Sequence, residues 1–303
     1  MEMSNFSLVL MGVLILLALY LLTQMHSLER FEDGKDEDNV PTETRTEYDS
    51  IYDEFYAGIY DKLFTTPELV SFQKASIREY ALTNWAKDDI KILDACCGTA
   101  PMADWLCKEG LDFVGVDQSE SMLKIARKKC TSARFYKGDI TRAETFTPKS
   151  FSHCLMLYFS IYQFQNPKMV LDNIYSWLKP SGVLVLHLVD PNKFDPILAA
   201  ASPFPAFSLQ KYSTERVIDS DLFFDSFKYR SRFVKDPHDD EARFEEVFEF
   251  SDPPKYVENN HMLHMPSVDA MLDIVRSSGF TRKDIVDMTS IGYEYQYLIY
   301  LSK

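Results

Sequence analysis

Acidic residues and a glycine follow two apolar stretches of the sequence at spacings that suit a nucleoside-binding site. Asp94 ends the stretch "IKILD", Gly98 lies in the loop after it, and Asp117 ends "LDFVGVD". Glycine lets the backbone approach a ligand closely, and an acidic side chain about 20 residues further on can accept hydrogen bonds from both ribose hydroxyls. The pattern therefore predicts a site for a cofactor that contains a nucleoside.

A third apolar stretch, "ARFYKGD", supplies the other half of this predicted site. Asp139 ends it and is placed to accept a hydrogen bond from an adenine amino group. Met122 and Ile140 are the residues expected to enclose the adenine ring.

The loop after the first stretch departs from the dinucleotide-binding pattern G-x-G-x-x-G. The corresponding positions hold Cys96, Gly98 and Pro101. Proline has no backbone N–H, so Pro101 removes a donor that a helix N-terminus would offer to a pyrophosphate. A cofactor without phosphate groups fits this loop better than a dinucleotide.

These residues need elements that bring the ends of the apolar stretches together. Beyond the amino-terminal 46 residues, apolar stretches alternate with segments of helical spacing, and "SHCLMLYF" and "SGVLVLHLVD" are two further predicted strands. Continuous apolar strands separated by helices are typical of a parallel sheet that is covered on both faces. The predicted fold class is therefore α/β, with ligands bound at the carboxyl ends of the strands.

Residues 195–265 form a predicted insertion between the fifth strand and the last helix. In "FDSFKYRSRFV", the residues alternate between a mainly aromatic face and a basic face. Such alternation predicts antiparallel strands. We expect a β-rich insertion that serves as a lid or as a homodimer surface.

Composition excludes some classes of function. The formal net charge of −14 argues against a nucleic-acid partner, because that affinity comes mostly from lysine and arginine side chains. The five cysteines form no C-x-x-C pair and no cluster with zinc spacing, so reduced thiols and no metal are expected. His261 and His264, in "HMLH", are expected to be structural or exposed.

The amino terminus predicts a membrane anchor. Residues 3–28 carry no charge, and their apolar core is long enough to cross a hydrocarbon layer of about 30 Å. A cleaved signal peptide is the alternative, but a basic leader and a small-x-small cleavage site are missing. We expect a transmembrane helix in residues 1–28, an acidic disordered tether in 29–46, and a single-pass protein whose catalytic domain faces the cytosol.

Four motifs in order resemble those of the class I S-adenosylmethionine-dependent methyltransferases: "ILDACCGTAP", "VGVDQSESMLKIARKK", "YKGDI" and "WLKPSGVLVLHL". The resemblance covers roughly residues 48–303, and the methyltransferase domain is expected over 47–303. It implies a Rossmann-like seven-stranded sheet that ends in an antiparallel hairpin, with S-adenosylmethionine as the cofactor. The expected cofactor-binding residues are Tyr60, Asp94, Cys96, Gly98, Asp117, Gln118, Met122, Asp139, Ile140 and Tyr158.

Within this superfamily, "YDSIYDEFYAGIYDKLF" and the strand-rich insertion look most like small-molecule N-methyltransferases of the sugar-amine and glycine type. In those relatives, tyrosines placed like Tyr52 and Tyr60 close over the substrate amine and the methionine end of the cofactor. The alternative is an aromatic helix face packed on the core. Tyr158, Tyr162 and Gln163 follow the fourth strand and are expected to line the acceptor pocket, although some relatives have histidine where Gln163 falls.

The family usually has glycine where this chain has Cys96 and Ala100. Both side chains are small enough to preserve the loop if its backbone avoids positive φ at these positions. Each adds a Cβ that faces the methionine moiety. We therefore expect weaker or altered cofactor binding, not its loss.

The sequence thus predicts a membrane-anchored methyltransferase for a small molecule, with an amine nitrogen as the acceptor and Tyr52, Tyr162 and Gln163 as catalytic candidates. An oxygen or lipid acceptor at the membrane is the enzymatic alternative. A tethered pseudoenzyme or binding module, inactivated by the changes at Cys96 and Ala100, is the other class.

Overall fold

The computed structural model describes residues 40–201, 210, 216–236 and 238–303. By its contacts, the chain divides into two units, Met1–Thr42 and Glu43–Lys303, and the architecture below is that of the second unit. The predicted anchor in residues 1–28 and most of the predicted tether lie outside the described residues. Within the described ranges, no helix combines the length and the apolar character needed to span a membrane.

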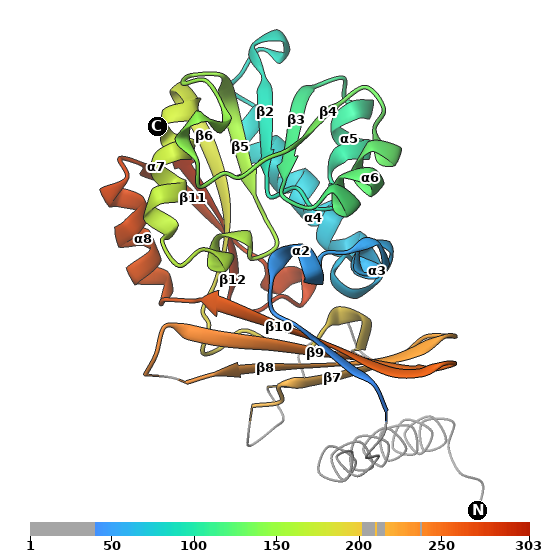
Figure 1. Ribbon diagram of the computed structural model, residues 1–303. Coiled ribbons are helices and arrows are strands. Elements are labelled where there is room, and N and C mark those ends of the chain that lie inside the picture. Colours follow the sequence, from blue (N-terminus) through green and yellow to red (C-terminus); the bar gives the residue numbers. More distant parts are fainter. Residues whose placement is uncertain (1–39, 202–209, 211–215, 237) are drawn as a thin grey trace, which may run out of the picture. The chain divides into compact units, whose positions relative to one another are not determined.

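A seven-stranded mixed sheet forms the centre of this unit (Figure 1). The five strands β6, β5, β2, β3 and β4 are parallel, whereas β12 and β11 form an antiparallel hairpin beside β6. The predicted α/β fold with an antiparallel carboxyl-terminal hairpin is confirmed. The strands in spatial order are β11 (Thr281–Asp287), β12 (Gln296–Ser302), β6 (Leu178–Val189), β5 (Phe151–Met156), β2 (Lys91–Ala95), β3 (Asp112–Asp117) and β4 (Arg134–Lys137).

Helices cover both faces of this sheet because its strands are apolar on both sides. Ile92 of β2 packs in a core with α4, α5 and α6, whereas its neighbour Leu93 packs in a second core with α7 and α8. The helices are α2 (Tyr48–Ile51), α3 (Glu54–Phe64), α4 (Pro67–Ile77), α5 (Ala103–Lys108), α6 (Glu120–Lys129), α7 (Pro167–Trp177) and α8 (Val268–Ser277). Short helical segments are the π-helix η1 (Arg78–Leu82) and the 3-10 helices η2 (Lys87–Asp89), η3 (Ala143–Thr145), η4 (Ser160–Gln163), η5 (Ala199–Ala201) and η7 (Thr289–Ile291).

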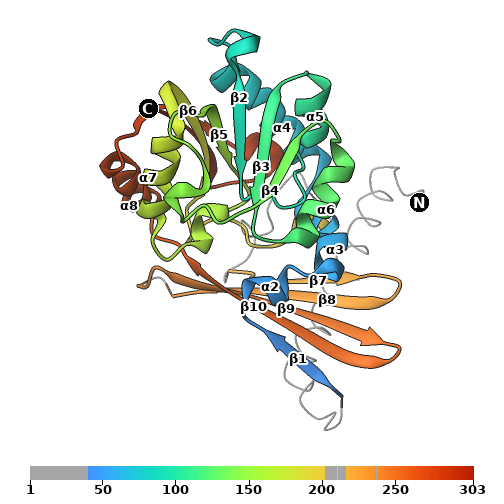
Figure 2. The same ribbon diagram turned by 45° about the horizontal axis from the view of Figure 1, so that its top comes forward.

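The insertion supplies four antiparallel strands, β7 to β10, of a second, five-stranded sheet, and β1 is the fifth strand (Figure 2). In β8, Phe227, Tyr229, Ser231 and Phe233 are buried and the residues between them are partly exposed, which confirms the predicted alternation. Its strands in spatial order are β1 (Thr42–Arg45), β10 (Pro254–His264), β9 (Glu241–Ser251), β8 (Phe227–Lys235) and β7 (Asp219–Phe223).

Strand β1 shows that the predicted tether does not extend to residue 46. The segment Thr42–Arg45 lies beside β10 at the edge of the five-stranded sheet. Thr44 Oγ1 donates a hydrogen bond to Glu258 of β10, 3.1 Å away. Threonine favours strands, and this edge offers unpaired backbone groups, so a tertiary partner orders a stretch that has no apolar periodicity.

The expectation of reduced thiols is wrong for one pair of cysteines. Cys107 and Cys130 form a disulfide, with their Cα atoms 6.2 Å apart. The packing of α5 against α6 brings together two residues that are 23 positions apart in sequence, and no local sequence motif predicts this pairing. Cys96, Cys97 and Cys154 are free.

Helices α2 and α3 lie between the carboxyl ends of the parallel strands and the five-stranded sheet (Figures 1 and 2). The Ser119 hydroxyl, after β3, donates to the Tyr52 carbonyl at the end of α2, 2.7 Å away. On the other side, Phe55 of α3 packs edge-on against Phe227 and Phe248 of the insertion. The two helices therefore connect the strand ends to the inner face of the insertion.

Candidate active site

The loop after β2 has a left-handed backbone at all three positions where the family pattern has glycine. The φ angles are +57° at Cys96, +51° at Gly98 and +51° at Ala100. The condition under which Cys96 and Ala100 would fit without strain is therefore not met. The loop turns back on itself through the Ala100 N–H, which donates to the Cys97 carbonyl at 2.7 Å. A left-handed conformation costs about 1–2 kcal/mol for a residue with a Cβ, so two of the three positions store strain.

Gly98 keeps the open space that a cofactor needs. A Cβ added there would meet no protein atom within 4 Å. The Gly98 N–H donates to one carboxylate oxygen of Asp117 at 2.8 Å. The other oxygen accepts from the Ser119 N–H at 2.9 Å and from the Tyr48 hydroxyl at 2.8 Å. Burial raises the pKa of Asp117, and the hydrogen bonds that it accepts act in the opposite direction.

Asp94 is a buried acid that forms no ion pair with a described residue, and only the charge of Lys129 acts to lower its pKa. Only 5% of its surface is exposed, and within the described part of the chain no hydrogen bond to its side chain is formed. Burial, together with the nearby charge of Asp117, raises its pKa to about 7. A ligand that brings an ammonium or sulfonium group beside Asp94 would supply the missing positive charge. The residues at these two strand ends therefore fit S-adenosylmethionine, which carries a ribose and two cationic groups.

The predicted adenine residues lie after β3 and β4, with Met122 in the first turn of α6. Met122 and Ile140 are both buried, and Gln118 and Asp139 are partly exposed. One oxygen of Asp139 accepts from the backbone N–H of Thr141 at 2.8 Å and from its hydroxyl at 2.7 Å. Their roles in binding adenine stay predictions.

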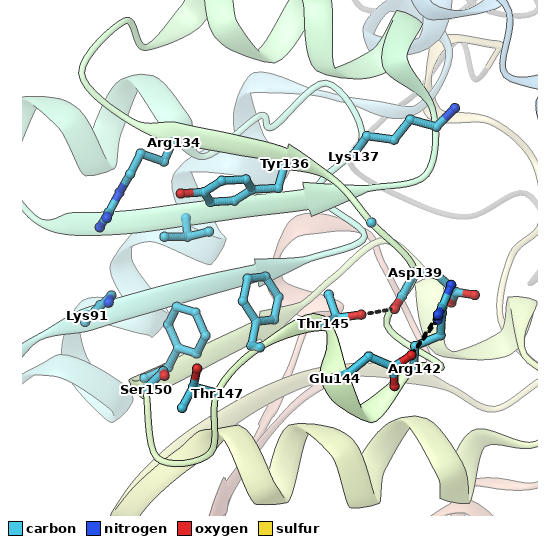
Figure 3. A pocket seen from close by; sticks show the side chains of 14 residues that line it. Lys91, Arg134, Tyr136, Lys137, Asp139, Arg142, Glu144, Thr145, Thr147 and Ser150 are labelled. Atoms are coloured by element: carbon cyan, nitrogen blue, oxygen red, sulfur yellow. Dashed lines mark hydrogen bonds and ion pairs between the residues drawn. The ribbon is translucent and has the colours of Figure 1, made fainter.

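A hollow of about 500 Å³ lies on the sheet beside β4 (Figure 3). Lys91, Tyr136 and Thr147 are among the residues that line it, and it reaches Gly138 and Asp139 at one end. Asp94 and Asp117, near the carboxyl ends of β2 and β3, do not line it. The hollow therefore borders the predicted adenine position without being the predicted cofactor site as a whole.

The tyrosines of α2 and α3 form a contiguous aromatic cluster. The Tyr52 ring lies 4.4 Å from that of Tyr48, 5.5 Å from that of Tyr56 and 6.5 Å from that of Tyr60, between ring centroids. Burial raises the pKa of the Tyr52 and Tyr60 hydroxyls, so both stay protonated at neutral pH. The side chain of Gln163 donates to the Tyr52 hydroxyl at 3.1 Å. The structure thus brings together two of the three catalytic candidates.

The other residues after β5 are placed differently. Tyr158 has a left-handed backbone with φ of +54°, and burial raises the pKa of its hydroxyl. Tyr162 is fully buried, and its hydroxyl accepts from the Val189 N–H at 2.9 Å and donates to the Val189 carbonyl at 3.3 Å. This geometry favours a structural role for Tyr162, and its catalytic role stays a prediction.

Sequence reasoning missed the contribution of the insertion to this region. His261 of β10 packs against Tyr52, with ring centroids 5.9 Å apart, and its Nε2 lies 2.7 Å from a carboxylate oxygen of Glu246 in β9. The available signal was "FEEVFEF", in which strict alternation places Glu246 on the aromatic face. A carboxylate on a buried face needs partners and is often functional.

Residues 92–182 match the family model described as a methyltransferase domain. Among curated proteins, the chain is 31% identical over 157 residues to a protein of Geobacillus sp. (strain WCH70) that is named as a methyltransferase. The aligned segment covers 49% of this chain and 62% of that protein. It is 31% identical over 120 residues to the malonyl-[acyl-carrier protein] O-methyltransferase of Halalkalibacterium halodurans, 36% of this chain and 43% of that protein. The chain thus spans about half the length of these curated relatives.

Solved structures share the fold over most of the chain. An S-adenosylmethionine-dependent methyltransferase from Clostridium acetobutylicum aligns with a TM-score of 0.59 and 18% identity, over 82% of this chain and 97% of that one. The amino pentose methyltransferase of Micromonospora echinaspora, bound to S-adenosylmethionine, aligns with a TM-score of 0.56 and 16% identity, over 82% and 96%. A sugar N-methyltransferase from Streptoalloteichus aligns with a TM-score of 0.57 and 17% identity, over 83% and 92%.

The chain therefore has the fold of the class I S-adenosylmethionine-dependent methyltransferases, and residues 92–182 are similar to a methyltransferase domain. The resemblance predicted from the four motifs is confirmed. These matches support an enzyme that uses S-adenosylmethionine, whereas no match identifies the atom that accepts the methyl group.

Proposed function

We propose that this chain is an S-adenosylmethionine-dependent methyltransferase that acts on a small molecule, with an amine nitrogen as the methyl acceptor. The observation that carries the proposal is Asp117, a buried acid that accepts the Gly98 N–H at the carboxyl ends of two adjacent parallel strands. The methyltransferase domain match supports the reaction. The structural neighbours named as amino pentose and sugar N-methyltransferases support nitrogen as the acceptor atom.

In this proposal, the residues at the strand ends hold the cofactor and the aromatic cluster holds the acceptor. Asp117 accepts hydrogen bonds from the ribose, and Asp94 balances the positive charge of the methionine part. When bound, S-adenosylmethionine supplies a methyl group activated by a sulfonium. Tyr52 and Gln163 orient the acceptor lone pair toward that methyl group, since transfer depends mainly on alignment.

Two observations favour alternatives. One curated relative is named as an O-methyltransferase, which supports an oxygen acceptor. The left-handed backbone at Cys96 and Ala100 supports a pseudoenzyme whose strained loop no longer holds the cofactor.

The test uses the full chain purified in detergent. Isothermal titration calorimetry with S-adenosylmethionine and S-adenosylhomocysteine measures cofactor binding. Transfer of a radiolabelled methyl group to glucosamine, ethanolamine, phosphatidylethanolamine vesicles or catechol then compares amine, lipid and oxygen acceptors. Cofactor binding together with methyl transfer to a soluble amine supports the proposal. A folded chain that binds neither S-adenosylmethionine nor S-adenosylhomocysteine favours the pseudoenzyme.

We also propose that the uncharged segment within residues 1–28 anchors the chain in a membrane, with the methyltransferase domain on the cytosolic side. The Cys107–Cys130 disulfide counts against this orientation, because disulfides persist mainly in oxidising compartments. Protease protection of sealed membranes, together with trapping of free thiols at lysis, tests the orientation. Protection from external protease and an intact disulfide would place the domain in the lumen.

A further inference from the structure

A buried carboxylate lies on the inner face of the insertion. Along β9, the side chains of Ala242, Phe244, Glu246 and Phe248 lie on the same face, and Glu246 has no exposed surface. An isolated carboxylate at such a position would be very unfavourable, so its hydrogen-bonding partners define what it does.

Four donors from three elements converge on Glu246. The Tyr56 hydroxyl of α3 lies 2.9 Å and 2.8 Å from its two oxygens, and the Tyr229 hydroxyl of β8 lies 2.8 Å from one of them. From β10, the Asn259 amide donates at 3.3 Å and the His261 Nε2 lies at 2.7 Å. Because Glu246 accepts the Nε2 proton, Nδ1 of the neutral His261 ring is the atom that carries a lone pair.

His261 borders the residues assigned to the acceptor. Its ring centroid lies 5.9 Å from that of Tyr52 and 5.6 Å from that of Phe244, and 10% of its side chain is exposed. Tyr52 in turn contacts Gln163 and packs against Tyr48, whose hydroxyl reaches the cofactor acid. Two aromatic rings, those of Tyr52 and Tyr48, therefore connect His261 to Asp117 at the predicted cofactor position.

We propose that His261 is a catalytic base for the acceptor and that Glu246 is its positioning residue, with a primary or secondary amine bound as its ammonium form. The inference rests on the proposed function. The buried carboxylate and the faces of the surrounding aromatic rings favour a cation over a neutral hydroxyl compound.

For a primary amine, a proton moves from the substrate to His261 before the methyl group is transferred. The ammonium group gives one proton to Nδ1 of His261, which leaves a neutral amine and an imidazolium that Glu246 stabilises. The nitrogen lone pair then forms the bond to the methyl carbon while the carbon–sulfur bond breaks, and its electron pair stays on sulfur as a thioether. The methylated ammonium product leaves, and the imidazolium releases its proton to solvent.

The titratable groups that face His261 come from α2, α3 and the insertion. Besides Glu246 they are tyrosines from α2, α3 and β8, and burial raises the pKa of each hydroxyl. These tyrosines are Tyr52, Tyr56, Tyr60 and Tyr229.

Nuclear magnetic resonance of the full chain, labelled with ¹⁵N-histidine and saturated with S-adenosylhomocysteine, tests the pair without turnover. We expect His261 to have its proton on Nε2 and its resonances to shift when glucosamine or ethanolamine is added. In Glu246→Gln, the affinity of His261 for a proton should fall at least tenfold. A proton on Nδ1, or an unchanged titration in Glu246→Gln, overturns the proposal.

Steady-state kinetics of the variants, measured with an amine that the wild type methylates, give a second test. His261→Gln should lower kcat at neutral pH about 100-fold, leave the KM for S-adenosylmethionine unchanged, and regain activity at high pH, where the amine loses its proton to solvent. His264→Gln, a matched change on the same strand at a residue paired with Glu241, should leave the rate unchanged. If Glu246→Gln does not fold, His261→Gln carries the test.

The outcomes separate this inference from the proposed function. Absence of S-adenosylhomocysteine binding overturns the proposed function, and the inference with it. Binding with amine methylation at the wild-type rate in His261→Gln overturns the inference alone. Methylation of hydroxyl compounds alone, with His261 required, overturns the amine class.

Discussion

The two halves of the candidate site are built in different ways. In the cofactor half, the backbone positions the acid, because Asp117 accepts N–H groups from Gly98 and Ser119, close to the ends of neighbouring strands. In the acceptor half, side chains from α3, β8 and β10 converge on Glu246, which lies in a different sheet. A site made by a loop motif depends on local conformation, whereas a site made by distant side chains depends on how the two sheets pack.

The largest expected effect is on the acceptor half. Glu246→Ala should lower the free energy of unfolding by about 4 kcal/mol, because buried tyrosine and asparagine donors lose their acceptor. Urea unfolding measures it. Glu245→Ala is the matched control, since Glu245 is partly exposed and pairs with Arg243 at the surface, and it should cost less than 1 kcal/mol. Equal effects of the two changes would contradict the central role of Glu246.

In the cofactor half, the first expected change is in the affinity for S-adenosylhomocysteine. Asp117→Ala removes the acceptor of the Gly98 N–H and should weaken S-adenosylhomocysteine binding at least 100-fold, or about 3 kcal/mol. Calorimetry measures the affinity. Asp112→Ala, at the other end of the same strand and exposed beside Arg134, should bind as the wild type does. Retained affinity in Asp117→Ala would mean that the cofactor is not bound at these strand ends.

Asp94 gives the cofactor half a pH dependence. Its pKa is raised from 3.8 to about 7 in the folded chain, so the folded state binds more protons than the unfolded state between these values, and stability falls as pH rises through this range. Asp94→Asn removes this slope, so the stability of the variant relative to the wild type should rise by about 4 kcal/mol between pH 4 and pH 8.

Unfolding by urea at several pH values measures this difference. The comparison with the variant isolates Asp94, because burial lowers the pKa of His153 and His187 to about 4 and gives stability a slope of the opposite sign at acidic pH. Parallel curves for the wild type and Asp94→Asn would show that Asp94 is ionised in the folded chain.

The smallest effect concerns the strained loop. Cys96→Gly and Ala100→Gly should each stabilise the chain by about 1 kcal/mol, because glycine adopts positive φ without a steric cost. Ala103→Gly, at the start of α5, should instead destabilise by about 1 kcal/mol. Tighter cofactor binding in the two loop variants would show that the backbone strain also weakens cofactor binding. Lower stability of both variants would refute the presence of strain at these positions.

Local patterns in the sequence were sufficient to predict the parallel strands, the order of the motifs and the position of Asp117 at the end of a strand. Each depends on neighbours within a few residues or on a fixed spacing, so it is present before the chain folds. The same holds for the alternation of Phe227 and Tyr229 in the insertion, where the strand period separates two faces.

Tertiary structure alone decided the rest. The left-handed backbone at Cys96 and Ala100 follows from the path of the loop over the sheet. The sequence does not predict it, because neither position is a glycine. The Cys107–Cys130 disulfide, strand β1 and the contact of His261 with Glu246 and Tyr52 each join residues from separate elements. Burial gives these contacts their chemistry, because a carboxylate, a histidine and a tyrosine acquire definite roles only when packing excludes water and fixes their partners.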